Sequence, residues 1–413
     1  MRRRLLGGLA LLGILIPATV ATADAHPARA HTASAQQCAE PFPAQRDPSN
    51  PLDLPSAPGA DPLSGANFFV DGPAHGSAAS TIAQLVGLDP KRLANSESWA
   101  TFERQLTSGG LSHRLSGDPA LAYKVHELEK IASQPEAQRF SMYSGGGGPG
   151  AIFKQVQKIL CANMTADPGT IPIINTYFLH PALGGCPTAA QVQGAGPVFR
   201  RRVDELAEGI GRRPAVMLLE LDAIGSSSCI AHDGAMADWE AALRYEINAV
   251  RALPHTVVYV EAGYSDGNSP SYTARILNAI GVSKIRGFFT NDTHQNWTSA
   301  EVHWAQQISK LTHGAHFIVN TSDNGRGPKL NPHPVTQGTE ALCNPPDRGI
   351  GPMDTTVTTS SQADAFLWTH PPGNSSGSCG GGTPSGTFWA AKAISMAAFA
   401  NSQLGPGYPS RPY

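Results

Sequence analysis

The stretch Val216-Met217-Leu218-Leu219-Glu220-Leu221-Asp222-Ala223-Ile224-Gly225 decides the fold. Its first six residues are almost continuously apolar, which is typical of a strand buried on both faces of a parallel sheet. A carboxylate, Asp222, follows at the point where this strand should end. Because loops at the carboxyl ends of parallel strands form the cleft of α/β proteins, the segment predicts a central strand with a functional acid beside it.

Short apolar runs recur on both sides of this strand, with helical patterns between them. Alternating strands and helices imply parallel pairing through right-handed crossovers. No repeat and no linker interrupt the pattern after residue 66. We therefore expect the α/β class, with a single distorted parallel β/α barrel (TIM-like) with long loops over residues 66–413. Strands are expected at 171–176, 216–221, 256–260, 287–290, 316–320 and 365–368, and helices at 121–131, 198–211, 237–253, 271–280, 301–311 and 388–400.

Composition limits the possible partners. The chain has 413 residues, of which 41% are hydrophobic and 15% charged, and its formal net charge is -2. The apolar share is sufficient for a buried core, and the length suits one α/β barrel. This charge balance lacks the excess of basic residues that nucleic-acid binding requires. We expect a monomer that binds no nucleic acid.

The N-terminal segment has the pattern of a secretory signal peptide. Met1-Arg2-Arg3-Arg4 precedes a short apolar run at 5–17, and Ala23-Asp24-Ala25 matches an A-x-A cleavage site. The run is too short for a membrane span, although a buried helix is an alternative. We expect a signal peptide at 1–25, a flexible Pro- and Ala-rich leader at 26–65, and a secreted protein without a membrane partner after cleavage.

The cysteine count predicts disulfides. An even number in an exported chain favours bridges, although six cysteines allow 15 connectivities. Proximity along the chain favours Cys186–Cys229 and Cys343–Cys379, which leaves Cys38 and Cys161 as a third pair. Without any C-x-x-C motif, we expect no metal site of that kind, and we expect no cofactor.

Polar residues follow the expected strands and should converge at one edge of the barrel. A carboxylate at the end of a buried strand loses hydration, which raises its pKa and suits a general acid. Asp222 is our candidate for that acid, and a cap on the following turn is the alternative. The residues expected at this edge are His180, Cys186, Asp222, Glu261, Asn291, Asp292, Asp323 and His370.

A second motif raises the possibility of esterase chemistry. Gly263-Tyr264-Ser265-Asp266-Gly267 matches G-x-S-x-G, the nucleophile elbow of α/β-hydrolases. That elbow requires a helix directly after the serine, whereas Ser269 and Pro270 have the pattern of a helix cap and first turn. A Gly-Ser loop is therefore the favoured interpretation, and an esterase acting through Ser265 is the distant alternative.

Several segments, in order, resemble glycoside hydrolase family 6, the inverting endoglucanases and cellobiohydrolases. The resemblance covers about residues 60–405, and the ordered set is more specific than any single motif. Leu219–Ile224 is similar to the family's E-P-D-[SA]-[LI] signature, with Leu221 in place of the proline. The other matching segments are Leu128–Ala137, Val258–Gly263, Gly287–Asn291, His316–Ser322, Asn324-Gly325, Cys343–Gly349 and Trp368–Gly373.

The resemblance implies a barrel that hydrolyses O-glycosidic bonds of a β-glucan or related polysaccharide with inversion and with Asp222 as general acid. Inversion needs a second carboxylate about 6.5–9.5 Å away. Here the chain departs from the family pattern. The family's R-D-C reads Gly184-Gly185-Cys186 and its E-S-D-G reads Asn374-Ser375-Ser376-Gly377, so the aspartate that tunes the acid and the aspartate proposed as base are replaced by Gly185 and Ser376.

The base must then come from elsewhere. The candidates are Glu261, which replaces the aspartate of the family's D-A-G, Asp266, Asp292, His180, or water relayed by Ser376. A catalytically impaired glycan-binding relative is the alternative function. Family tryptophans that carry sugar rings correspond to Arg139, Gly267 and Leu342, and the family's two bridges fit Cys186–Cys229 and Cys343–Cys379. The resemblance implies substrate-binding roles for His180, Asn291, His294, Trp297, Trp368, His370 and Asn374.

Overall fold

The computed structural model describes residues 61–93, 97–179, 188–232, 234–329 and 343–400. Within these residues, the centre of the fold is one sheet of seven strands that follow one another in chain order. Each strand pairs in parallel with the next. The strands are β1 (Gln138–Ser141), β2 (Ile173–Tyr177), β3 (Ala215–Leu219), β4 (Thr256–Glu261), β5 (Gly287–Thr290), β6 (His316–Asn320) and β7 (Ala363–Leu367).

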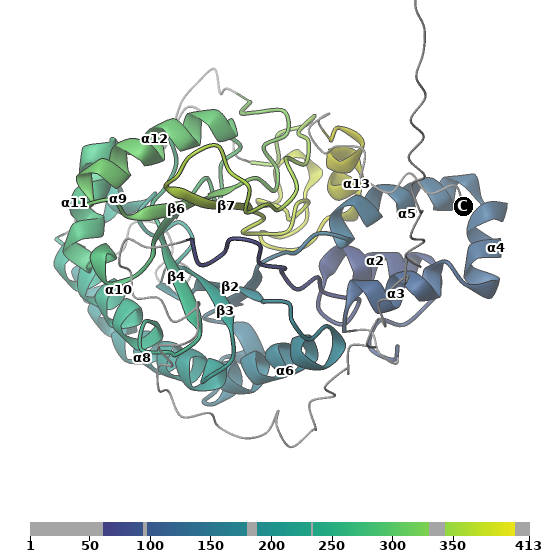
Figure 1. Ribbon diagram of the computed structural model, residues 1–413, viewed down its shortest axis with the longest axis horizontal. Coiled ribbons are helices and arrows are strands. Elements are labelled where there is room, and N and C mark those ends of the chain that lie inside the picture. Colours follow the sequence, from purple (N-terminus) through teal and green to yellow (C-terminus); the bar gives the residue numbers. More distant parts are fainter. Residues whose placement is uncertain (1–60, 94–96, 180–187, 233, 330–342, 401–413) are drawn as a thin grey trace, which may run out of the picture. The chain divides into compact units, whose positions relative to one another are not determined.

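Helices connect the strands and cover the outside of the sheet. In the described part of the chain they are α2 (Ser77–Leu85), α3 (Trp99–Leu106), α4 (Gly109–Gly117), α5 (Pro119–Ala132), α6 (Ala151–Ala166), α8 (Ala189–Ile210), α9 (Ser227–His232), α10 (Met236–Val250), α11 (Pro270–Ile280), α12 (Thr298–Leu311) and α13 (Ala390–Ala398). Figure 1 shows α6, α8, α10, α11 and α12 following one another around the strands. The C-terminal helix α13 instead packs on α5 and α2 from the start of the domain.

The strands separate two apolar layers. Because successive side chains of a strand point to opposite faces, β3 contributes to both. Val216 and Leu218 belong to a cluster inside the barrel, whereas Ala215, Met217 and Leu219 pack with the surrounding helices. Every residue of β3 is buried, which explains why its sequence is continuously apolar rather than alternating.

The sheet curls into a distorted, incomplete barrel, as predicted. The backbone N–H of Ala137, before β1, donates to the carbonyl of Trp368, after β7, at 3.1 Å. The side chain of Asn175 on β2 donates to the carbonyl of Thr369 at 3.1 Å. These bonds draw the first and last strands together without a regular ladder between them. The predicted α/β class and single distorted barrel are therefore confirmed.

A charged network is buried inside the barrel, near the amino ends of the strands. The carboxylate of Asp364 on β7 accepts two hydrogen bonds from Arg286, at 2.7 and 2.8 Å. It also contacts Nδ1 of His316 at 2.8 Å and accepts from the Tyr259 hydroxyl at 2.6 Å. The side chains of Arg286 and Asp364 are only 3% and 1% exposed. The network therefore ties β4, β6 and β7 to the residue preceding β5.

The predicted Cys343–Cys379 disulfide is confirmed, and its Cα atoms lie 6.1 Å apart. It connects the segment that begins at Cys343 with the long loop after β7. Cys161 and Cys229 are also disulfide-bonded. Their predicted partners, Cys38 and Cys186, lie outside the described residues, so those two pairings remain predictions.

We expect the double variant Cys343→Ser/Cys379→Ser to lose about 3–4 kcal/mol of unfolding free energy, because the bridge closes a loop with a sequence separation of 36 residues. Urea unfolding of the variant and the oxidised wild type measures this difference. Equal unfolding free energies for the two proteins would show that the bridge does not stabilise the fold.

No helix among the described residues is both long and apolar enough to cross a bilayer. The predicted signal peptide and most of the predicted leader fall within residues 1–60, outside the described part of the chain. The predicted boundaries of the signal peptide, leader and barrel domain therefore remain predictions.

Candidate active site

Polar side chains gather at the carboxyl ends of the strands, as the strand order requires. The turn after β3 has an unusual backbone: Glu220 and Asp222 have φ of 57° and 62°, and Asn291 after β5 has 66°. Such left-handed conformations are uncommon outside glycine and gather at functional sites. Two of the predicted residues, His180 and Cys186, lie outside the described residues.

Glu220 fixes the loop that leaves β2. Its fully buried carboxylate accepts hydrogen bonds from the backbone N–H groups of Phe178 and Leu179, at 2.8 to 3.1 Å. The backbone N–H of Glu220 itself donates to the hydroxyl of Thr176 at 2.9 Å. Burial raises the pKa of Glu220 to about 7, although these donated bonds oppose the shift. Glu220 thus acts on loop geometry, beside the acid that follows it.

Asp222 follows β3 and is the partly exposed carboxyl group of this cluster. Its side chain is half-buried, and Oδ1 accepts a hydrogen bond of 2.8 Å from the hydroxyl of Thr293, an exposed residue of the loop after β5. Its backbone N–H donates to Oδ2 of Asp292 at 3.0 Å. The carboxyl group of Asp222 is therefore held from one side by a hydroxyl and remains partly accessible to solvent.

The alternative role for Asp222, as the cap of the following turn, is taken by another residue. The backbone N–H groups of Ile224 and Gly225 donate to Oε2 of Glu261, at 2.5 and 3.1 Å. Gly225 can pass so close because it lacks a Cβ, which would lie 3.2 Å from Oε1 of Glu261. Since Glu261 binds these amides, the carboxylate of Asp222 is available for chemistry.

Two further carboxyl groups lie behind Asp222 and are completely buried. Burial raises the pKa of Asp292 well above its usual value, and the charge of Asp222 adds to the shift. Burial likewise raises the pKa of Glu261, with further contributions from Asp292 and Asp222. Among the described residues, neither Oδ1 of Asp292 nor Oε1 of Glu261 has a hydrogen-bond partner. Both groups therefore favour the protonated form, in which a carboxyl cannot accept a proton from water.

A cation from β1 faces this acidic cluster. The guanidinium carbon of Arg139 lies 5.9 Å from the ring centroid of Tyr177, at the end of β2. Burial lowers the pKa of Arg139, while the charges of Tyr177, Asp222 and Asp292 favour its protonated form. The arginine predicted to replace a stacking tryptophan thus lies beside the acids of the site.

The Gly263–Gly267 segment forms a loop rather than a nucleophile elbow. Helix α11 begins at Pro270, and the side chain of its cap residue, Ser269, accepts from the N–H of Tyr272. The backbone N–H of Ser265 donates to the carboxylate of Glu301 at 2.8 Å. Because no helix follows Ser265 directly, the turn that would expose a nucleophilic serine is not formed, and the structure does not support the esterase alternative.

Asp266 and His294 are brought together on this loop. Oδ1 of Asp266 lies 2.9 Å from Nδ1 of His294 and accepts a 2.7 Å bond from the side chain of Asn296. The buried imidazole of His294 stacks on the ring of Tyr264, with centroids 3.3 Å apart. These contacts join the β4 and β5 loops to each other.

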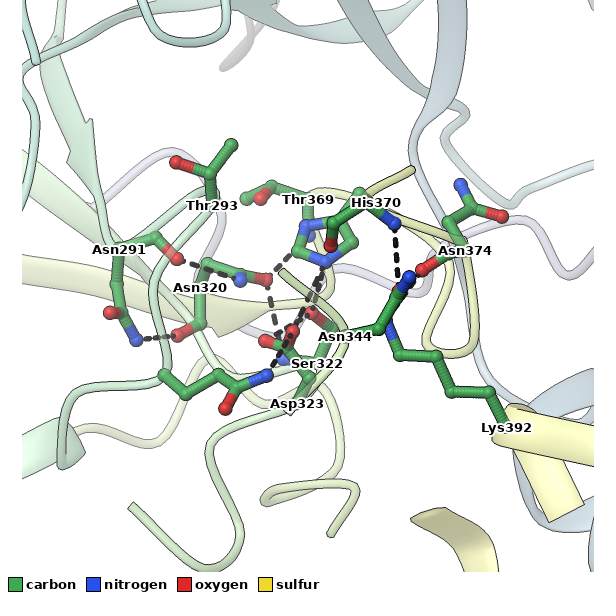
Figure 2. A network of polar contacts seen from close by, with 12 residues as sticks. Asn291, Thr293, Asn320, Ser322, Asp323, Asn344, Thr369, His370, Asn374 and Lys392 are labelled. Carbon is green, nitrogen blue, oxygen red and sulfur yellow. Dashed lines mark hydrogen bonds and ion pairs between the residues drawn. The ribbon is translucent and has the colours of Figure 1, made fainter. Parts of the chain in front are cut away.

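A polar network extends from the end of β5 to α13 (Figure 2). The side chains of Asn291 and Asn320 each donate to the other's carbonyl, at 3.0 and 2.9 Å. Oδ2 of Asp323 lies 3.5 Å from Nε2 of His370 and accepts a 3.4 Å bond from the side chain of Gln295. These bonds connect the ends of β5, β6 and β7.

The loop after β7 is held by a lysine of α13. Nζ of Lys392 donates to the carbonyl of Asn374 at 2.7 Å and to Oδ1 of Asn344 at 3.2 Å. The backbone N–H of Ser376 donates to the same Asn344 oxygen at 2.9 Å, and the residue is exposed. Asn374 and Ser376 therefore lie with Asn344 and Lys392, and their catalytic and binding roles remain predictions.

Two predicted aromatic contacts differ sharply in accessibility. Trp297 is 51% exposed and precedes α12, so its ring is available to a ligand. Trp368 is completely buried, and its indole N–H donates to the carbonyl of Pro352 at 2.9 Å. This burial argues against the binding role predicted for Trp368, because a sugar ring cannot stack on an indole enclosed by core side chains.

The described residues contain no group of three or more His, Cys, Asp or Glu arranged to hold a metal ion. Sequence reasoning identified Asp222, Asp292 and Asp323 from their positions after strands, but it did not find Gln295 or Lys392. Gln295 lies in a loop and Lys392 in helix α13, and neither belongs to a sequence motif. Only the three-dimensional arrangement shows that Gln295 contacts Asp323 and that Lys392 contacts Asn344.

A curled parallel barrel with several carboxyl groups at the carboxyl ends of its strands is typical of enzymes that work on bound sugars or other polar substrates. Comparison with known proteins specifies the family. The sequence profile of Glycosyl hydrolases family 6 matches residues 184–399, more than half of the chain. The chain therefore belongs to glycosyl hydrolases family 6.

Individual relatives agree with this assignment. Endoglucanase 1 of Streptomyces sp. (strain KSM-9) is 33% identical over 278 residues, which cover 65% of this chain and 70% of that protein. Endoglucanase A of Cellulomonas fimi is 29% identical over 270 residues, and the match spans 55% of its length. The solved structure of endoglucanase Cel6 from Mycobacterium tuberculosis, in complex with methyl-cellobiosyl-4-deoxy-4-thio-β-D-cellobioside, superposes with a TM-score of 0.63 at 27% identity, over 82% of this chain and 99% of that one.

Proposed function

We propose that this chain is a glycoside hydrolase that cleaves O-glycosidic bonds of a β-1,4-glucan or related polysaccharide with inversion, and that Asp222 is its general acid. The placement of Asp222 carries the proposal. Its half-buried carboxyl group lies at the carboxyl edge of the barrel, is hydrogen-bonded by Thr293 and lies beside two fully buried carboxyl groups. A general acid needs such a site, where it reaches the substrate while part of its surface is dry.

The comparisons support the substrate class. The Streptomyces and Cellulomonas fimi relatives are endoglucanases, and the Mycobacterium tuberculosis structure holds a thio-linked cellobioside. We further propose that the protein is secreted after removal of residues 1–25 and acts as a monomer without a cofactor. The exposed indole of Trp297 suits a contact with a pyranose ring, since sugars carry apolar faces.

We expect the first product released from a soluble β-1,4-gluco-oligosaccharide to have the α configuration at its new anomeric carbon. In inversion, water attacks the face opposite the leaving oxygen in a single displacement. Proton NMR during the first minutes, before mutarotation, distinguishes the two anomers. Release of the β-anomer would contradict the inverting mechanism.

A catalytically impaired glycan-binding relative is the second candidate. The observation that favours it is the serine at position 376, where the resemblance implies a catalytic aspartate. In that case the protein would bind the oligosaccharide in calorimetry but release no reducing ends. The two functions are therefore separated by measuring binding and turnover on the same sample.

A further inference from the structure

Resting on the function proposed above, we propose that Asp323 is the general base that activates the attacking water. Inversion requires an ionised carboxylate across the cleft from the acid. Glu261 and Asp292, two of the sequence candidates, are completely buried in the cluster behind Asp222. Asp323 lies instead in the loop after β6, three strands along the sheet from β3, and its side chain retains 11% exposure.

The surroundings of Asp323 suit an ionised group. Nε2 of His370, after β7, lies 3.5 Å from its Oδ2, and Gln295 donates to the same oxygen at 3.4 Å. Oδ1 accepts a 3.3 Å bond from the hydroxyl of Ser322. Figure 2 shows the imidazole of His370 directed at this carboxylate. Polar groups of the loops after β5, β6 and β7 thus approach Asp323 together.

The electrostatics of Asp323 are opposite to those of the buried carboxyls. Burial alone would raise the pKa of Asp323, but the charge and hydrogen bond of His370, the charge of Lys392 on α13 and the bond from Gln295 together lower it. Burial raises the pKa of Asp292 and Glu261. A general base must be ionised to take a proton from water, so the lowered pKa favours Asp323 over Asp292 and Glu261 for this role.

One short loop connects Asp323 to the acid. Thr293 contacts Asp222 and Gln295 contacts Asp323, so both carboxylates bind the loop after β5. Residues two positions apart have Cα atoms no more than about 7 Å from each other. The same loop therefore contacts both carboxyl groups, so its conformation affects the position of each.

The proposed step balances as a single displacement. The water oxygen forms a bond to the anomeric carbon while its proton passes to the carboxylate of Asp323. The bond from the anomeric carbon to the glycosidic oxygen breaks, and its electron pair stays on that oxygen, which takes the proton of Asp222. Solvent then removes the proton from Asp323 and returns one to Asp222, and His370 holds the base in place throughout.

The test compares Asp323→Asn with wild type on cellotetraose. We expect kcat to fall at least 100-fold, because general-base catalysis contributes about 10²–10⁴-fold, with little change in the Kd of a non-hydrolysable thio-linked β-1,4-gluco-oligosaccharide. The matched control is Asp354→Asn, an aspartate that accepts from the N–H of Trp368 at 2.8 Å and lies outside the proposed machinery. It should leave kcat within about threefold of wild type.

Azide distinguishes a lost base from a damaged fold. In Asp323→Ala, azide needs no deprotonation, so it should attack the anomeric carbon directly, restore turnover and yield the α-glycosyl azide. A second variant, His370→Gln, should move the acidic limb of the kcat/KM pH profile to higher pH, because the carboxylate loses a partner that lowers its pKa.

Three outcomes would overturn the assignment. If Asp323→Asn keeps a near-normal kcat, Asp323 is not the base, although the proposed function still stands. If Asp266→Asn then loses kcat at least 100-fold, Asp266 is the base instead. A folded Asp323→Ala that azide does not rescue would show that Asp323 acts by binding or packing. A wild-type chain that binds the oligosaccharide without turnover would overturn both the base and the proposed hydrolase.

Discussion

Replacing Asp222 by Asn should lower the kcat for β-1,4-glucan hydrolysis by about 10²–10⁴-fold, the contribution of a positioned proton donor. The amide has nearly the same shape and can still accept the hydrogen bond that Thr293 donates to Asp222. It cannot supply a proton to the departing glycosidic oxygen. Reducing-end assays on soluble glucan measure kcat, and calorimetry with a thio-linked oligosaccharide should show an unchanged Kd.

The control for this variant is Asp238→Asn, on the outer helix α10, where the carboxylate accepts a 2.8 Å bond from Gln193. It removes the same charge from a contact between the outer helices α10 and α8 and should leave kcat unaltered. A hydrolysis rate that survives in Asp222→Asn would remove Asp222 from the mechanism. On an aryl glycoside, whose leaving group needs less protonation, Asp222→Asn should lose less activity than it does on glucan.

The position of Asp222 after its strand is predictable from sequence, whereas its hydrogen bonds are not. A carboxylate after a continuously apolar strand is visible as a pattern, and the parallel order brings Glu261 and Asp292 to the same edge. The backbone bond from Asp222 to Asp292 depends on left-handed conformations at Asp222 and Asn291, which no local pattern announces. Trp368 shows the converse problem, since residue type alone does not distinguish a sugar platform from a core side chain.

Some elements of the fold are likewise predictable from sequence, and others are not. The six predicted strands are present because each is a short, mostly buried run rich in apolar residues between turn signals, and α11 begins at its predicted cap and proline. Strand β1 was not predicted, because Gln138–Ser141 contains one fully buried residue, Phe140, among polar ones. Helices α2, α3, α4, α6 and α9 were also not predicted. β1 is a strand because it pairs with β2, a tertiary cause that outweighs weak local preference.

The largest effect on stability should come from Asp364→Asn inside the barrel, with a loss of about 3–5 kcal/mol of unfolding free energy at neutral pH. The variant leaves the guanidinium of Arg286, 3% exposed, without its charged partner. Burial alone would raise the pKa of Asp364, but the bonds and charge of Arg286 and the bonds of His316 and Tyr259 lower it. Urea unfolding at several pH values measures the difference.

The pH dependence has a definite sign. A carboxyl group with a lowered pKa in the folded state stabilises the protein fully above its unfolded-state pKa of about 3.9, and that stabilisation is lost as the pH falls through the folded value. The gap between wild type and Asp364→Asn should therefore narrow below about pH 4. A constant gap down to acid unfolding would show that packing, rather than charge, accounts for the loss.

Glu136→Gln provides the matched control, because Glu136 is also buried but its pKa is shifted in the opposite direction. Burial raises the pKa of Glu136, and the nearby Asp71 and Asp354 add to the shift. An acid held protonated in the folded state opposes folding at neutral pH, so its removal should preserve or increase stability there. Two buried carboxyl groups thus make opposite contributions, and the difference lies in their partners. Asp364 binds a bidentate arginine, whereas Oε1 of Glu136 has no hydrogen-bond partner within the part of the chain that the structure describes.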